Sequence, residues 1–293
     1  MNDASPTLPI FQVSQFGARL RVIPTLPAAV LLALCLLGFL APLIAPHSPM
    51  QGSLGEKLRP PAWVTGGQWA YPLGTDLLGR DILSRLLYGA RTSLAVAAVA
   101  VVVAGTLGTI LGLLSGYFGG VVDAIIMRFT DIALSLPLIL VAIVLAAAIG
   151  TSFGNVILVI VLLLWPRYAR QVRGETLSIK ERDFVALARI ANCSHFRIIW
   201  RHIFPSVLPT LLVLVTLQAG YIVLLESTLS FLGVGIPPST PAWGLMISEG
   251  RTVMDSAWWV VLWPGLAILL MVLSGNLLGD WLRDRLDPTL KQV

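Results

Sequence analysis

The chain is organised around residues 166–209, which read PRYARQVRGETLSIKERDFVALARIANCSHFRIIWRHIFPSVLP. This stretch lies between long apolar runs, yet it carries eight Lys and Arg against three acidic residues. Cytoplasmic loops of membrane proteins concentrate Lys and Arg. The stretch is therefore predicted to be a cytoplasmic segment between membrane spans.

Residues 183–204 are predicted to form two short helices joined by a turn. Apolar side chains recur with helical spacing on one face of each helix: Phe184, Leu187 and Ala191 on the first, and Phe196, Ile199 and Ile203 on the second. Asn192 fits the left-handed position that ends a helix, Ser194 can cap the next helix, and Pro205 is expected to stop it. A bent, basic helix pair at a membrane face is suited to docking another protein.

The composition indicates an all-α polytopic membrane protein. Of the 293 residues, 56% are hydrophobic and 12% are charged, and the mean hydropathy is +0.85. A soluble protein would have about 25% charged residues. We attribute the net charge of +5 to membrane topology rather than to nucleic-acid binding. The two cysteines form no metal or redox pattern.

Six apolar spans are predicted as transmembrane helices, at about 27–45, 92–115, 132–149, 155–166, 210–232 and 258–278. The tail 1–26 precedes the first span, which lacks a cleavage site and should remain as an anchor. Residues 46–91 form a loop whose last part, 81–91, is expected to lie along the membrane surface. The transmembrane domain, 92–288, contains the docking segment 166–209, and a short tail, 289–293, follows it.

An even number of spans places both termini on one side of the membrane. With the N-terminus inside, that side receives fourteen Lys and Arg, and the opposite side receives six. The positive-inside rule therefore predicts cytoplasmic termini, a cytoplasmic docking segment and an extracytoplasmic loop 46–91.

Glycines recur at intervals of four in and after the second span, as Gly108, Gly112, Gly116 and Gly120. Such a ridge of small residues lets a neighbouring helix approach closely. We expect it to pack within the chain, with a subunit interface as the alternative.

Polar residues within the spans are candidates for a substrate path, because intramembrane ionisable groups are costly and are commonly functional. Glu226 and Gln218 in the fifth span are the two candidates. For Glu226 the alternative is a structural hydrogen bond to Ser227, Thr228 or a neighbouring helix.

Motifs for catalysis are absent from the sequence. It contains no Gly-rich phosphate loop ending in Gly-Lys-Ser/Thr, no His-Glu-x-x-His pattern and no Gly-x-Ser-x-Gly nucleophile elbow. The three histidines are scattered, so no metal centre is expected. We predict a chain that neither hydrolyses ATP nor acts as an enzyme.

Four stretches carry a resemblance to a known family: LGTDLLGRDILSRLLYGARTSL (73–94); GYFGG (116–120) with Asp123, Met127, Arg128, Asp131 and LSLP (134–137); ESTLSFLGVG (226–235) with Pro237, Pro238, Pro241 and Trp243-Gly244; and GDWLRDRLDP (279–288). They resemble the membrane-spanning permease subunits of ATP-binding cassette importers. The match is closest to the C-type permease of dipeptide, oligopeptide and nickel importers.

This resemblance implies a binding-protein-dependent permease (MetI-like) fold in the inner (plasma) membrane. It also implies three kinds of partner: a second homologous permease, two cytoplasmic ATP-binding subunits that use ATP and Mg²⁺, and an extracytoplasmic solute-binding protein. No cofactor is expected on this chain. Import of short peptides is the leading function, and nickel or another small polar solute is the alternative. A stand-alone channel or sensor scaffold is the alternative of a different class.

The resemblance places the family's coupling helices in the docking segment, under the pattern Glu-Ala-Ala-x3-Gly-x9-Ile-x-Leu-Pro. On this chain the pattern runs from Ala186 to Pro205, and only Ala188 and Pro205 match. Five positions differ: Ala186 for Glu, Leu187 for Ala, Asn192 for Gly, His202 for Ile and Phe204 for Leu. Because the carboxylate is lost, we expect apolar insertion to carry the coupling, by Phe184, Leu187, Phe196 and Ile199.

Overall fold

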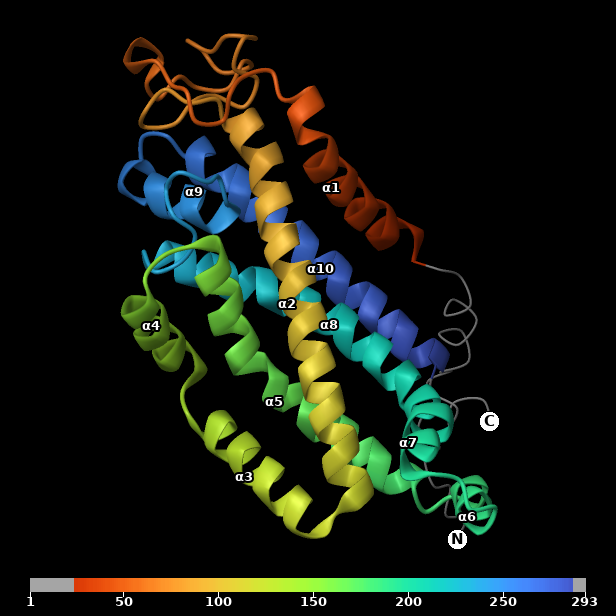
Figure 1. Cartoon of the computed structure of the whole chain (residues 1–293). Helices are drawn as coiled ribbons and strands as arrows, with labels where there is room; N and C mark the ends of the chain where they lie inside the picture. Colours follow the sequence, from red (N-terminus) through yellow and green to blue (C-terminus); the bar gives the residue numbers. More distant parts are fainter. Residues whose placement is uncertain (1–23, 287–293) are drawn as a thin grey trace, which may run out of the picture.

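The computed structural model describes residues 24–286, which form helices and loops (Figure 1). The longer helices are α1 (Thr25–Ile44), α2 (Ile82–Phe118), α3 (Gly120–Ser135), α4 (Leu138–Ile149), α5 (Phe153–Ile179), α8 (Phe204–Phe231) and α10 (Trp259–Leu286). The short elements are η3 (Leu54–Glu56), α6 (Asp183–Ile190), α7 (His195–Ile198), η4 (Ile199–Ile203), α9 (Trp243–Gly250) and η5 (Arg251–Val253). The predicted tail 289–293, and residues 1–23 of the predicted tail 1–26, lie outside the described residues.

The predicted all-α membrane fold is confirmed. Five runs are long and apolar enough to cross a membrane: α1, α2, α5, the continuous run from α7 to the end of α8, and α10. The remaining predicted span, the third along the chain, corresponds to α3 and α4, which are bent by 93° at the break between them.

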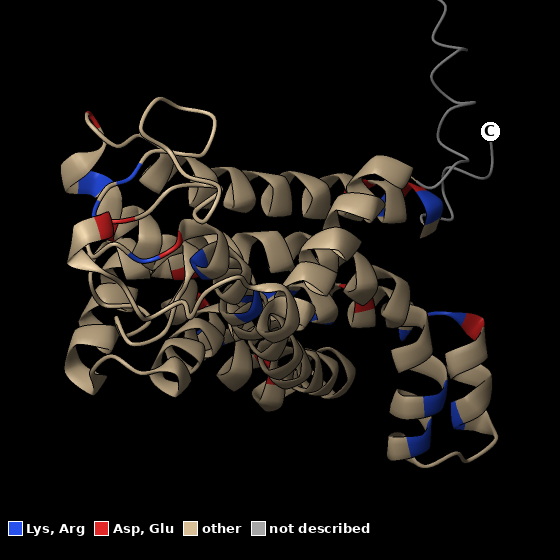
Figure 2. Cartoon of the chain, turned by 90° about the horizontal axis from the view of Figure 1, so that it is seen from above, with Lys and Arg blue, Asp and Glu red and all other residues tan. Residues whose placement is uncertain are grey.

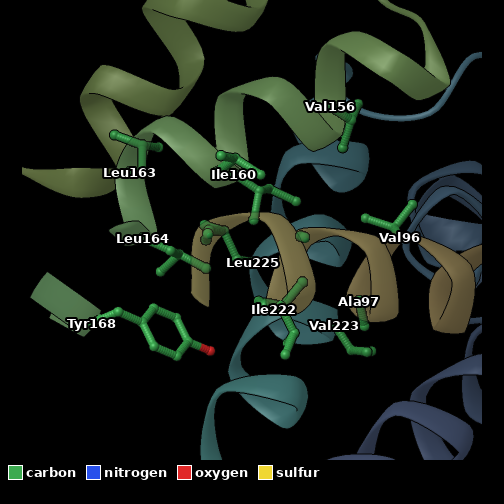
Figure 3. Close-up of a cluster of buried hydrophobic side chains, with 14 of the residues drawn as sticks. Val96, Ala97, Val156, Ile160, Leu163, Leu164, Tyr168, Ile222, Val223 and Leu225 are labelled. Atoms are coloured by element: carbon green, nitrogen blue, oxygen red, sulfur yellow. The ribbon is translucent and has the colours of Figure 1, made fainter. Parts of the chain in front are cut away.

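The core lies where α2, α5 and α8 meet (Figure 3). Val96 and Ala97 of α2, Ile160, Leu164 and Tyr168 of α5, and Ile222 and Val223 of α8 are all at most 3% exposed. Helices α1 and α10 pack on the other side of α2 and α8, and α3 and α4 pack against α5. Full burial of a large apolar side chain contributes about 1.5–3 kcal/mol relative to water.

Helix α2 is longer than predicted, because residues 81–91 are not a separate surface helix. The Asp81 carboxylate caps the helix by accepting from the backbone N–H of Ser84 at 2.9 Å. Ile82 and Arg85 are at most 1% exposed, so this first turn belongs to the interior. With 37 residues, α2 extends about 55 Å, which is longer than the ~30 Å hydrocarbon layer.

The third predicted span is broken at Pro137. Proline cannot donate the helical hydrogen bond, and its ring pushes the preceding residue out of the helical region. Leu136 is accordingly extended, with ψ 141°. The prediction of one continuous span over 132–149 was wrong for this reason.

The fourth predicted span ended at Pro166, but α5 continues through it to Ile179. Tyr168, Ala169, Val172 and Thr176 are buried in this extension. Packing against α2 therefore overrides the local cost of the proline. The polar segment that leaves the bundle begins at Lys180, not at residue 166.

The glycine ridge packs α2 against α5 within the chain. A Cβ at Gly108 would lie 2.5 Å from the carbonyl oxygen of Trp165, and one at Gly112 would lie 2.6 Å from that of Ala169. Gly116 meets Thr176 in the same way. Gly120 does not belong to this ridge: it is the first residue of α3, with φ +52°, and a Cβ there would meet nothing within 4 Å.

Candidate docking surface and cavity

Two short helices project from the end of the bundle at which α2 ends and α8 begins (Figures 1 and 2). The first is α6, and the second is α7 followed by η4; together we call them the docking pair. Figure 2 shows the pair standing apart from the bundle, with basic residues along it. The predicted pair of helices over residues 183–204 is confirmed.

Asn192 makes the turn between the two helices, as predicted. It has φ +57°, the left-handed conformation that Asn tolerates better than most residues. The N–H of Cys193 donates to the carbonyl of Ala188 at 3.1 Å, and the N–H of Asn192 donates to that of Arg189 at 3.0 Å. These two bonds form a Schellman motif, which satisfies the last carbonyls of α6.

The second helix begins as predicted but does not stop at Pro205. Ser194 accepts from the N–H of Arg197 at 3.4 Å and caps α7. Residues Ile199–Ile203 then form a π-helical turn that leads directly into α8. Pro205 lies in the first turn of α8, where a missing N–H is tolerated. The docking pair is therefore continuous with a membrane helix.

The outer face of the docking pair is apolar. Its exposed large side chains are Phe184 (38%), Leu187 (64%), Ile190 (82%), Phe196 (72%) and Trp200 (42%). We call these five residues the docking surface. Ala186 and Asn192 are also exposed, whereas Ala188 is 7% exposed and packs inward.

Ile199 is not on this surface, which corrects the prediction that it inserts into a partner. It is 7% exposed and belongs to the same buried cluster as Ile198 and Ile203. The π-helical turn changes the phase of the helix, so Trp200 is exposed instead of Ile199. His202 is partly buried, and Pro205 is exposed beside it.

The basic residues of the segment divide into two groups. Those on α5 are used inside the chain: Arg170 pairs with Asp131 at 2.7 Å, and Arg173 pairs with Asp123 at 2.5 Å. On the docking pair, Arg189, Arg197 and Arg201 are exposed beside the docking surface. We call these three residues the basic rim.

Tyr117, at the end of α2, attaches the docking pair to the bundle. Its hydroxyl lies 2.8 Å from Nδ1 of His195, the first residue of α7. The guanidinium of Arg189 in α6 lies 5.7 Å from the centre of the Tyr117 ring. One side chain of α2 thus contacts both helices of the pair.

A cavity of about 660 Å³ opens near the docking pair, between α5, α8 and α10. Polar groups from all three helices line it: Gln171, Glu175 and Arg182 from α5 and the segment that follows it, Ser206 and Thr210 from α8, and Arg283 from α10. Sequence reasoning missed this site, because only the folded helices bring these residues together.

Glu226 lies in the interior and does not line this cavity. It is 0% exposed, and its carboxylate accepts from Ser93 of α2 at 3.1 Å and from Ser230 at 2.7 Å. Ser230 also accepts from the N–H of Ile236 at 3.2 Å. Glu226 therefore links α2, α8 and the loop after α8, which favours the structural alternative. Gln218, 7% exposed, lies two turns before it on α8.

At the opposite end of α2, buried charges join the loop 46–81 to α9. Arg85, 1% exposed, pairs with Asp76 and with Glu249 of α9, the latter at 2.7 Å. Arg80 pairs with the same two carboxylates at 2.6 and 2.7 Å. The stretch 73–94, which contains Asp76, Arg80 and Arg85, was singled out in the sequence. Its pairing with Glu249, 164 residues after Arg85, could not be predicted from that stretch.

Comparison with known proteins gives one family and close full-length relatives. Residues 108–292 match the family described as "Binding-protein-dependent transport system inner membrane component". The dipeptide transport system permease protein DppC of Haemophilus influenzae is 44% identical over 262 residues, covering 89% of each chain. The protein of that name from Escherichia coli K12 is 47% identical over 249 residues, covering 85% of this chain and 83% of the relative.

Solved structures share the fold at low sequence identity. A chain of the methionine ABC transporter MetNI, from an inward-facing crystal form, superposes with a TM-score of 0.58 at 17% identity. It covers 69% of this chain and 96% of its own length. A chain of an amino acid ABC transporter gives a TM-score of 0.54 at 12% identity, with 69% and 94% covered.

Proposed function

The chain belongs to the family of binding-protein-dependent transport system inner membrane components, and we propose that it is the permease subunit of an ATP-driven importer of dipeptides and other short peptides. The peptide substrate is proposed from the permeases that are 41–47% identical to this chain, whose names refer to dipeptides or to di- and tripeptides. In this account the chain hydrolyses nothing itself, and ATP with Mg²⁺ is bound by partner subunits.

The observation that carries the proposal is the exposed apolar surface of the docking pair. Five large apolar side chains on two short helices form a patch of the kind that marks a protein interface. Because α7 and η4 continue into α8, a displacement of the pair would be passed directly to a membrane helix. This is the mechanical connection that an ATP-driven permease requires.

We propose that an ATP-binding subunit covers the docking surface on the cytoplasmic side. The basic rim, Arg189, Arg197 and Arg201, favours an apolar groove with acidic edges on that subunit. Ala186 is exposed on the same helix and carries no charge, so apolar contact provides the affinity. The assembly would be completed by a second, homologous permease, a second ATP-binding subunit and an extracytoplasmic binding protein, in the inner membrane.

Reconstitution tests this function. The four-subunit complex in proteoliposomes should take up a radiolabelled dipeptide only when ATP and loaded binding protein are both supplied. Purification through a tag on this chain should also recover the ATP-binding subunits. Uptake that continues without ATP, or purification that recovers no ATP-binding subunit, would support a channel instead. A system that binds nickel chelates but not peptides would change the substrate and leave the machinery in place.

A further inference from the structure

The cavity between α5, α8 and α10 contains both signs of charge. Gln171 and Glu175 lie one turn apart on one face of α5, Arg182 follows the end of that helix, and Arg283 lies in the last turn of α10. Ile179, Val213, Leu214 and Leu217 supply an apolar wall between the polar groups. Its volume of about 660 Å³ is within the range of about 300–1,000 Å³ that is usual for sites that hold small molecules.

Glu175 is the acidic group that lines this cavity, and little in the chain neutralises it. It accepts a hydrogen bond from the hydroxyl of Thr210 at 3.2 Å. Within residues 24–286 no ion pair to Glu175 is found. By contrast, the nearby Arg170 and Arg173 are paired with acidic residues of α3. A carboxylate in a cavity with room beside it is placed to receive a cation.

Arg167 lies on the same face of α5 as Glu175, about two turns farther from the docking pair. Its guanidinium lies 4.5 Å from the centre of the Tyr221 ring and donates to the Tyr221 hydroxyl at 3.3 Å. Arg167 does not line the cavity, and the arginines that do are Arg182 and Arg283. The cavity thus offers one carboxylate, Glu175, to a cation and two guanidinium groups, Arg182 and Arg283, to an anion.

We infer that this cavity binds a zwitterionic peptide, with its terminal ammonium at Glu175 and its terminal carboxylate at Arg182 and Arg283. Glu175 lies four residues before the end of α5 at Ile179, which corresponds to about 6 Å along the helix, and Arg182 follows three residues later in the non-helical segment. An extended di- or tripeptide spans about 7–11 Å, so one short peptide can reach from Glu175 to Arg182. This inference rests on the proposed function, because peptide import is what would bring such a ligand to the site.

The test measures protection of a cysteine in the cavity within the reconstituted complex. Ser206 lines the cavity and is exposed, and its hydroxyl donates to the carbonyl oxygen of His202 at 3.0 Å. Ser206→Cys is introduced after Cys35→Ser and Cys193→Ala, which remove the two native cysteines. Labelling of this subunit by a methanethiosulfonate reagent is then followed by intact mass, with a dipeptide or its N-acetylated amide added.

The free dipeptide should slow labelling, and the capped dipeptide, which lacks both terminal charges, should not. Glu175→Gln and Arg283→Gln should each raise the half-protecting concentration about tenfold, as expected for the loss of one charge-assisted hydrogen bond. The matched controls are Glu181→Gln and Arg285→Gln, which change exposed residues outside the cavity lining. Both should leave protection unchanged.

Two results separate this inference from the proposed function. If ATP-driven dipeptide uptake occurs but free and capped dipeptides protect Ser206→Cys equally, or Glu175→Gln changes nothing, the inference is overturned and the importer stands. If the wild-type complex shows no ATP-dependent uptake while the dipeptide still protects in a Glu175-dependent way, the site stands and the proposed function fails.

Discussion

The hydroxyl of Tyr117 lies 2.8 Å from Nδ1 of His195 and joins the end of α2 to the first residue of the second docking helix. The same ring lies under the guanidinium of Arg189. Because α7 and η4 also continue into α8, the docking pair is fixed to two membrane helices. A force on the docking surface would therefore act on α2 and α8 together.

Tyr117→Phe should weaken this attachment while keeping the ring and its contact with Arg189. Loss of one hydrogen bond costs about 0.5–1.5 kcal/mol, so we expect a small fall in the melting temperature of the purified complex. Stimulation of ATPase activity by loaded binding protein should fall as well. Tyr168→Phe is the control, because the Tyr168 hydroxyl is buried and has no hydrogen-bond partner within residues 24–286. Equal effects of the two changes would show that the Tyr117–His195 contact has no special role.

Gly112→Ala should destabilise the fold, because the new methyl would lie 2.6 Å from the carbonyl oxygen of Ala169 in α5. Forcing a group into a packed interface costs about 1–3 kcal/mol. The control is Gly174→Ala on α5, where a Cβ meets nothing within 4 Å and the better helix former adds up to about 1 kcal/mol. Thermal unfolding of the complex in detergent should separate the two variants. If Gly112→Ala is as stable as the wild type, α2 and α5 are less closely packed than described.

Glu226→Ala should lower stability more than Glu226→Gln. The alanine leaves the hydroxyls of Ser93 and Ser230 without the acceptor that they now share, at a cost of about 1–3 kcal/mol. Glutamine keeps one acceptor oxygen, so dipeptide uptake should remain close to that of the wild type. A Glu226→Gln complex of normal stability that no longer transports would instead place this carboxylate in the substrate path.

Arg85→Met should disrupt the charge cluster at the far end of α2. Removing one partner of a buried ion pair costs about 3–5 kcal/mol, and the lower part of this range is expected because Arg80 remains on Asp76 and Glu249. Arg91→Met, an exposed position on the same helix, should change stability by less than about 0.5 kcal/mol. Similar melting temperatures for the two variants would show that the cluster is not structural.

The features predicted correctly from the sequence are those that depend on residues close together in the chain. Apolar runs defined the membrane helices, and Asn192 and Ser194 were assigned from their roles at helix ends. The errors arise where packing outweighs local preference. Pro166 is held inside α5 because the residues beyond it pack on α2, and Ile199 is buried because a π-helical turn breaks the 3.6-residue period.

The cavity and the charge cluster, which were not predicted, each depend on residues that are far apart in the sequence. Glu175 and Thr210 are 35 residues apart, and Arg283 joins them only because α10 returns to the same end of the bundle. Arg85 and Glu249 are 164 residues apart. One sequence contains the residue types at both positions but not the contact between them, so neither the cavity nor the charge cluster could be located before the fold was known.

The most direct test of the account is ATPase stimulation by loaded binding protein in the reconstituted complex, compared between Phe196→Asp and Ala186→Lys. Phe196 is 72% exposed on the docking surface, and a charge there would have to be buried against the partner. We expect Phe196→Asp to abolish stimulation while dipeptide binding by the binding protein is unchanged, and Ala186→Lys to have a smaller effect. Full stimulation with Phe196→Asp together with its loss in Ala186→Lys would show that the apolar docking surface does not carry the coupling.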